Sequence, residues 1–491
     1  MRALRRTGLL AGGVLGLAAA CGDPPPLPPT DEPRLVILYM PCTVSKGYLS
    51  PYAPDVAYTP RLAEFAEESA VFERHVTEAG SSGIAYASIL SGGQAEHHGV
   101  FLHPEVLAEE LHLVAEAYAE NGYDTWYWVD HAMASPGLEY DQGVPAENVR
   151  ERPALAFRIR GKLHRLWSRL WGRTLRHPYP ALVAGDSAFR GILERLREDP
   201  EYKAFVMTAF SVTHGTYGNH NLERFRREHP EEARGITDAQ IEKYDAIYRE
   251  NLRPLAWNLA DTVERLGLSE REVEELAAVL DLLYKSNVSY LDRVFGELVD
   301  RVESAGLLDQ SLIAFTADHG EVLYREGADF AWSHSYQLAP EVIGVPLLIR
   351  GPGVEPGRYA GVTRSMDLFP TLAGLSGLPA DAARDAPGVD LSAAVRGEAE
   401  PPRLLGPSHT AILHEATHEQ MHDPESAHLW THLRELYPRR DVDLIWVSIR
   451  DGDLLYKWKK RIDAGWGMEV FDIARDPEEL VDLHDPGDPR H

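Results

Sequence analysis

The chain has 491 residues, with 49 basic against 76 acidic side chains and a formal net charge of −27 at pH 7. This excess of negative charge argues against nucleic acid as the main partner, because a polyanion needs a basic surface. The composition, 44% hydrophobic and 25% charged, is that of a globular protein. Its length fits either one large domain with an appendage or several domains.

The N-terminus has the pattern of a targeting signal. Early arginines precede an apolar stretch from Leu9 to Ala20, which is too short for a comfortable transmembrane helix. Small residues then lead into Cys21, as at a bacterial lipoprotein cleavage site. We therefore expect a signal peptide over 1–20, a lipid on Cys21 and a proline-rich tether over 21–33, with ordinary secretory cleavage as the alternative. The expected location is the periplasm or cell envelope, with the membrane reached through the lipid anchor.

The first part of the folded chain alternates predicted strands and helices. Residues 34–41 form an apolar run typical of a buried parallel strand. Residues 59–76 predict a helix with Thr59 as its N-cap. Residues 78–93 are small and lead into a second apolar helix, and 110–129 read as a helix, a glycine stop and an aromatic strand.

The same alternation continues further along the chain. Residues 204–212, 312–317 and 345–354 predict three more buried strands, and a long helical pattern covers 283–308. Strands that alternate with helices predict an α/β fold with a mostly parallel sheet.

Residues 34–402 are expected to form the main domain, with two helix-rich polar insertions, 130–200 and 218–280, that shape a substrate entrance. Within the first insertion, the basic segment 158–177 interleaves Trp and Leu at helical spacing. It is typical of a solvated amphipathic helix, and a membrane-surface helix is the alternative.

The C-terminal residues 403–491 have a different pattern. Two alternating apolar stretches over 443–460 are joined by Asp451-Gly452, a strong signal for a β-hairpin. We therefore predict a small antiparallel subdomain at this end of the chain.

The segment FTADHGE, residues 315–321, places polar side chains directly after a buried strand. One interpretation is a helix start, with Asp318 as N-cap and Glu321 as its capping-box partner. The other is that Asp318 and His319 are metal ligands at the carboxyl end of a central strand, where open α/β sheets place their chemistry.

Several motifs in order along the chain support the second interpretation. Residues 34–375 and 443–485 resemble the sulfatase branch of the alkaline-phosphatase superfamily. The resemblance is carried by the stretches TPRLAEFAEESAVFERHV, ASILSGGQAEHHGV, YLDRVFGELVDRVESAGLLDQSLIAFTADHGE, VPLLIRGPGVEPG, SMDLFPTLAGLSGLP and VFDIARDPEELVDL. It implies a three-layer fold with a mostly parallel central sheet and a small C-terminal antiparallel subdomain. Residues 211–218 and 334–346 are also similar to segments of phosphoethanolamine transferases.

The resemblance also implies roles for single residues. Asp318 and His319 match the metal-ligand pair, and His214 and His334 match histidines that contact the transferred anion and its leaving oxygen. Ser82 matches the nucleophile and is also expected among the metal-binding residues, and Ser81 is the fallback nucleophile.

The nucleophile motif departs from the sulfatase pattern at two positions. Ile84 replaces its proline and Tyr86 its arginine, which argues against conversion of Ser82 to formylglycine. An unmodified hydroxyl activated by a metal is then the expected nucleophile, and a structural helix start is the alternative.

A second departure affects the metal site. Cys42 stands where the family has an acidic ligand after the first strand, and Gly47 replaces the next acid. Cys42 can serve as a ligand if the single divalent ion is zinc rather than calcium or manganese. The alternative is a buried thiol in a metal-free relic.

The sequence therefore predicts a sulfatase-like hydrolase that acts on sulfate or phosphate esters of a small molecule, glycan or lipid. The alternatives are a metal-free pseudoenzyme that acts as a binding protein, and a phospho-group transferase or phosphodiesterase.

Overall fold

The computed structural model describes residues 25–101, 105–151, 183–257, 259–325, 331–335, 337–410, 445–461, 465–477 and 479–484. The predicted signal peptide, Cys21 with its predicted lipid and the basic segment 158–177 lie outside these residues. None of the described helices combines the length and the apolar character that crossing a membrane requires.

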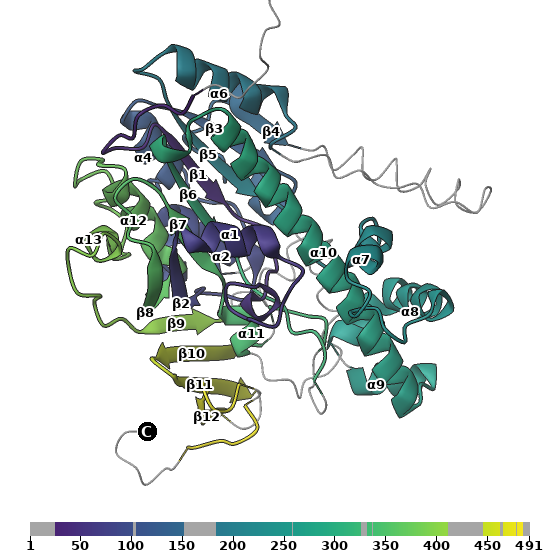
Figure 1. The fold of residues 1–491 in the computed structure, drawn as a ribbon. Coiled ribbons are helices and arrows are strands. Elements are labelled where there is room, and N and C mark those ends of the chain that lie inside the picture. The colour runs from purple at the N-terminus through teal and green to yellow at the C-terminus, as the bar shows by residue number, and fades with distance from the viewer. Residues whose placement is uncertain are drawn as a thin grey trace, which may run out of the picture.

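The main domain is built on an eight-stranded sheet in the order β4-β3-β5-β1-β6-β7-β2-β8 (Figure 1). Only β7 runs antiparallel to its neighbours β6 and β2, and the other pairs are parallel. The predicted α/β class with a mostly parallel sheet is confirmed. The strands are β1 (Leu35–Tyr39), β2 (Ala70–Val76), β3 (Tyr123–Val129), β4 (Val149–Glu151), β5 (Lys203–Ala209), β6 (Ser311–Thr316), β7 (Leu347–Arg350) and β8 (Gly357–Arg364).

Helices cover both faces of this sheet and give three layers. Alternate residues of β1 point to opposite faces, as the strand period of two requires: Leu35 and Ile37 to one core, Val36 and Leu38 to the other. The first core contains side chains of α1 (Pro60–Glu67), α6 (Ser187–Glu198) and α10 (Glu270–Ser304). The second contains those of α2 (Ser82–Ser91), α4 (Val114–Glu120) and α12 (Leu368–Leu375).

One predicted helix is wrong in its second half. The structure ends α1 at Glu67 and places strand β2 at Ala70–Val76, where we expected helix to continue to residue 76. Ala70 continues the helical spacing of apolar residues, which is why the periodicity misleads. The aromatic and β-branched residues Val71 and Phe72 instead pair with β7 and β8, contacts that no local pattern reveals.

The long helix α10 begins at Glu270, earlier than its pattern predicts, because Ser269 and Glu272 form a capping box. It also supports α1. Thr59 is the N-cap residue of α1, but its side chain does not cap. Instead, the buried carboxylate of Asp292 accepts the N–H groups of Leu62 at 2.7 Å and Arg61 at 3.2 Å.

The second predicted insertion contains α7 (Leu222–Glu228), α8 (Asp238–Trp257), α9 (Leu259–Leu266) and the start of α10. These helices extend from one end of the main domain (Figure 1). Residues 130–200 also contribute β4 and α6 to the layers of the main domain. Three short α-helices also belong to the described part of this domain, in addition to several 3-10 turns: α3 (Ala95–His98), α11 (Pro340–Ile343) and α13 (Ser392–Val395).

The C-terminal part forms a four-stranded antiparallel sheet, β12-β11-β10-β9, as predicted (Figure 1). Its strands are β9 (Gly406–His409), β10 (Ile445–Asp451), β11 (Leu454–Arg461) and β12 (Gly465–Asp472). The predicted hairpin turn lies between β10 and β11, where Gly452 has a φ of 62°. This conformation suits glycine because it has no Cβ to clash.

Candidate active site

The predicted site residues meet at one edge of the main sheet. Cys42 follows β1, and Asp318 and His319 follow β6, its parallel neighbour. Ser82 is the first residue of α2, whose N-terminus faces the same edge. Adjacent parallel strands end at the same edge of a sheet, and the pairing of β1 with β6 brings Cys42 close to Asp318 and His319.

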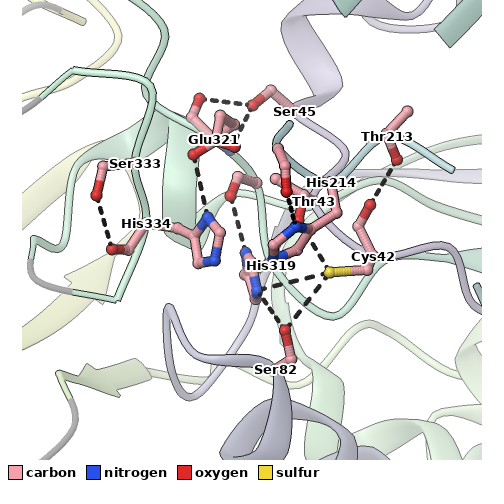
Figure 2. Close-up of polar contacts among 12 residues, drawn as sticks. Cys42, Thr43, Ser45, Ser82, Thr213, His214, His319, Glu321, Ser333 and His334 are labelled. Carbon is pink, nitrogen blue, oxygen red and sulfur yellow. Dashed lines mark hydrogen bonds and ion pairs between the residues drawn. The ribbon is translucent and has the colours of Figure 1, made fainter. Parts of the chain in front are cut away.

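Three side chains form the centre of the site (Figure 2). The Ser82 hydroxyl lies 3.0 Å from Nε2 of His319, and the Cys42 Sγ lies 3.5 Å from that hydroxyl and 4.0 Å from the same Nε2. All three residues are at most 1% exposed. Their reactive atoms therefore point toward one another in a space largely closed to bulk water.

Asp318 is also fully buried, and its two oxygens differ. Oδ1 accepts hydrogen bonds from the N–H groups of Thr43 at 2.9 Å and His319 at 2.7 Å. Oδ2 has no hydrogen-bond partner in the described part of the chain and lies 3.4 Å from Nε2 of His319. A buried carboxylate oxygen without a donor is costly unless a cation or a protonated group faces it.

The alternative of a helix cap at Asp318 is wrong. Residues 318–325 contain no helix, so there is no N-terminus for the carboxylate to cap. Oδ1 of Asp318 instead accepts the N–H of Thr43, which joins the loop after β6 to the loop after β1.

The protonation of His319 can be read from its contacts. Its Nδ1 lies 2.9 Å from the carbonyl oxygen of Gly320, which can only accept, so Nδ1 carries the hydrogen. Burial lowers the pKa of His319, so the ring is neutral. The lone pair of Nε2 is then directed to Ser82 and Cys42, the arrangement that metal-binding histidines use.

The Cys42 thiol is neutral in these surroundings, because burial, and then the nearby charge of Asp318, raises its pKa well above the usual range. Thiol, carboxylate and imidazole donor atoms of Cys42, Asp318 and His319 all lie within 4.8 Å of one another. A divalent cation fits these three donors and would supply the missing partner of Asp318 Oδ2. Its binding would displace the thiol proton.

His214 and His334 lie beside this centre, as the resemblance implies (Figure 2). The ring of His334 lies 4.3 Å from that of His319 and 5.1 Å from that of His214, between centroids. Nδ1 of His334 contacts Oε1 of Glu321 at 3.1 Å. Burial raises the pKa of Glu321 to about 7.

His131 belongs to the same site and was missed from the sequence. Its ring nitrogen lies within 4.8 Å of the donor atoms of Cys42 and His214. Nδ1 of His131 accepts the N–H of Met133 at 3.2 Å, so a neutral ring carries its hydrogen on Nε2. This form donates hydrogen bonds and does not ligate a metal through Nε2. His131 could have been found because it follows β3, whose end meets the same sheet edge.

The other predicted positions lie as follows. Ser81 is the N-cap residue of α2, but its buried Oγ neither caps the helix nor meets another partner among the described residues. Gly47 lies exposed in the turn Lys46–Tyr48. Ile84 and Tyr86 are buried in α2, and the Tyr86 hydroxyl donates to the carbonyl oxygen of Met40 at 3.3 Å.

Several known proteins are similar to this chain in sequence or in structure. The chain is 32% identical over 203 residues to choline-sulfatase from Rhizobium meliloti, covering 41% of the chain and 32% of the relative. It is 25% identical to the ulvan-active sulfatase of Formosa agariphila, over 71% of this chain and 63% of that sulfatase. The phosphonate monoester hydrolase of Agrobacterium radiobacter has a similar structure, with a TM-score of 0.60, 18% identity and coverage of 92% and 91%.

The chain thus covers less than two thirds of the length of these curated relatives. The sequence profile of the family described as Sulfatase matches residues 36–378, more than half of the chain. Members of this family typically use a divalent metal, and the cluster of Cys42, Asp318 and His319 is the candidate for it. The chain therefore belongs to the sulfatase family of the alkaline-phosphatase superfamily.

Proposed function

We propose that this protein hydrolyses sulfate esters with Ser82 as its nucleophile. The observation that carries the proposal is the position of the Ser82 hydroxyl, 3.0 Å from His319 Nε2 and 3.5 Å from Cys42 Sγ at the start of α2. A hydroxyl beside a metal-binding cluster is a sensible nucleophile for a tetrahedral ester centre.

Cys42, Asp318 and His319 would hold one divalent ion. Zinc suits them better than calcium or manganese, because thiolate and imidazole are zinc ligands and the harder ions prefer oxygen. When bound, the ion would polarise the ester anion and lower the pKa of a neighbouring hydroxyl.

The chain's own residues supply the rest of the site. Ser81 leaves the N-terminus of α2 without a side-chain cap, so the partial positive charge of the helix end and its free N–H groups favour an anion beside Ser82. His131, with its hydrogen on Nε2, is a donor for a sulfate oxygen. In this proposal His214 and His334 contact the anion and donate a proton to the leaving oxygen. Glu321 orients His334 through Nδ1.

The relatives support a substrate class. The relatives include a choline-sulfatase and an ulvan-active sulfatase, which supports a sulfate ester of a small molecule or glycan, and a lipid ester fits the expected location. Phosphate and phosphonate esters are the runner-up, because a phosphonate monoester hydrolase has the same fold.

A substrate screen tests this proposal. The purified protein is assayed with 4-nitrophenyl sulfate, phosphate, bis-phosphate and phosphonate, before and after addition of zinc. Sulfate hydrolysis should be the fastest and should disappear in Ser82→Ala. Ser91→Ala is the matched control, because Ser91 is a buried serine at the other end of α2 whose hydroxyl, among the described residues, donates to the carbonyl oxygen of Ala87. Equal loss in both variants would remove Ser82 from its role.

The rival function is a metal-free binding protein. It is favoured by one observation, the presence of a cysteine, Cys42, at the position where the family has an acidic ligand. Elemental analysis of protein prepared without chelator separates the two, because the rival carries no metal and hydrolyses none of the esters.

The location is proposed on Cys21 alone. Wild-type protein should be recovered with the membrane fraction and Cys21→Ala should be soluble. Full solubility of the wild type would contradict a lipid anchor.

A further inference from the structure

The residue after Cys42 has an unusual backbone conformation. Thr43 has a φ of 63°, in the left-handed region. A β-branched residue is strongly disfavoured there, because its Cβ crowds the neighbouring carbonyl group. Such a conformation persists only where the surrounding structure holds it, and it is found preferentially at functional sites.

Three contacts hold Thr43 in place. Its N–H donates to Asp318 Oδ1 at 2.9 Å, its Oγ1 lies 2.9 Å from Cys42 Sγ, and its carbonyl oxygen accepts from the Tyr284 hydroxyl at 2.9 Å. The first two partners belong to the candidate metal cluster. The third partner, Tyr284, is not part of that cluster and lies in the middle of α10.

The Tyr284 hydroxyl holds the loop from both sides of the strained residue. While it donates to the carbonyl oxygen of Thr43, it accepts the N–H of Ser45 at 3.0 Å. The Ser45 hydroxyl in turn accepts the N–H of Glu321 at 2.8 Å, which joins this loop to the one that carries His319. One buried hydroxyl thus fixes the direction in which the chain leaves Cys42.

The position of Tyr284 is itself rigid. The residue is fully buried, and its ring packs against those of Tyr48 at 4.9 Å and Tyr217 at 5.3 Å. A phenylalanine would keep these ring contacts and lose only the two hydrogen bonds.

We propose that Tyr284 is a positioning residue that holds Thr43 in its left-handed conformation and thereby aims the Cys42 thiol at Ser82 and His319. The metal part of this inference rests on the proposed function. The geometric part does not, because the direction of the thiol can be measured without a metal.

The test compares Tyr284→Phe with the double variant Tyr284→Phe/Thr43→Gly. In the single variant, the zinc dissociation constant should rise by about ten- to hundredfold, as for other residues that orient metal ligands. In chelator-treated protein, the labelling of Cys42 by N-ethylmaleimide, mapped by mass spectrometry, should become several-fold faster. Glycine reaches the left-handed region without penalty, so the double variant should return both values toward wild type.

Tyr248→Phe is the matched control. Tyr248 is another fully buried tyrosine, it stacks on Tyr217, and its hydroxyl has no hydrogen-bond partner among the described residues. Its variant should change neither measurement.

Three outcomes overturn the inference: an unchanged labelling rate in Tyr284→Phe, an equal change in Tyr248→Phe, or failure of Thr43→Gly to restore the site. If Tyr284→Phe does not fold, the double variant should fold with Cys42 protected, and its failure to do so counts against the inference. If wild type binds no zinc, the proposed function fails, and the labelling experiment still decides the role of Tyr284.

Discussion

Two aspartates of this protein are both buried and accept the same number of backbone hydrogen bonds, but they differ in the role that we assign to them. Asp292 and Asp318 are each at most 2% exposed, and each accepts two backbone N–H groups. In Asp292 each carboxylate oxygen accepts one of the two bonds. In Asp318 both bonds go to Oδ1, and Oδ2 lies beside Cys42 and His319 without a donor among the described residues. The first carboxylate is fully engaged as a cap of α1, and the second keeps one oxygen for a ligand.

The comparison teaches that burial and residue type do not separate a structural acid from a functional one. What distinguishes the functional acid is a carboxylate oxygen that accepts no hydrogen bond from the described residues. We therefore predict that loss of Asp318 removes the metal, whereas loss of Asp292 lowers the stability of the fold.

The largest effect is expected at Asp318. Asp318→Ala should remove the bound metal completely, and His319→Ala should do the same, because each supplies one of three donors. Elemental analysis of folded protein measures this directly. Asp292→Ala is the control, and a loss of metal in that variant at full folding would break the comparison.

Substitution of Cys42 should have an intermediate effect. Cys42→Ser should weaken metal binding and shift the preference toward harder ions, because it replaces a soft donor by oxygen. Cys42→Asp recreates the family's acid and should keep or improve binding. Competition titrations with zinc and manganese measure both changes. Identical metal preferences in wild type and Cys42→Ser would show that the thiol is not a ligand.

The loss of Asp292 should appear in stability. Asp292→Ala leaves the N–H groups of Arg61 and Leu62 without their acceptor, which costs about 1–3 kcal/mol for a buried unsatisfied group. Denaturant unfolding measures this cost. If the unfolding free energy changed by less than about 0.5 kcal/mol, as for an ordinary surface substitution, Asp292 would not act as the cap of α1.

The smallest effect is a pH dependence at the same residue. Burial raises the pKa of Asp292 to about 7, above the value of about 4 in an unfolded chain. The folded state therefore binds the proton more tightly, and this contribution is complete below pH 4 and is lost as the pH rises to 7. Asp292→Asn cannot titrate, so wild type should lose stability relative to it over this range. A constant difference in unfolding free energy would contradict the raised pKa.

Much of the fold was predictable because its signals are local. Buried strands, glycine stops and the Asp451-Gly452 turn depend on neighbouring residues, and the end of a predicted central strand points to Asp318 and His319, whereas Cys42 was assigned from the family resemblance. The family resemblance supplied Ser82, His214 and His334, and the structure brings all of these together. Their chemical roles remain predictions.

What the sequence did not reveal depends on distant partners. Strand β2 is defined by pairing with β7 and β8, so the helical spacing of Ala70 was misleading. The contact of Tyr284 with Thr43 joins residues 241 positions apart. The left-handed conformation of Thr43 has no signal either, because glycine is the residue that usually marks it.

The attachment of the C-terminal sheet has a consequence for synthesis. Strand β9 binds the segment that leads into Ser82: the N–H of His409 donates to the carbonyl oxygen of Glu78 at 2.8 Å, and the Ser408 hydroxyl donates to that of Thr77 at 2.5 Å. The latter partners are 331 positions apart. At about 5–20 residues per second, the ribosome makes residue 408 many seconds after residue 77. A nascent chain therefore carries Ser82 many seconds before it has the strand that binds the segment leading into this serine.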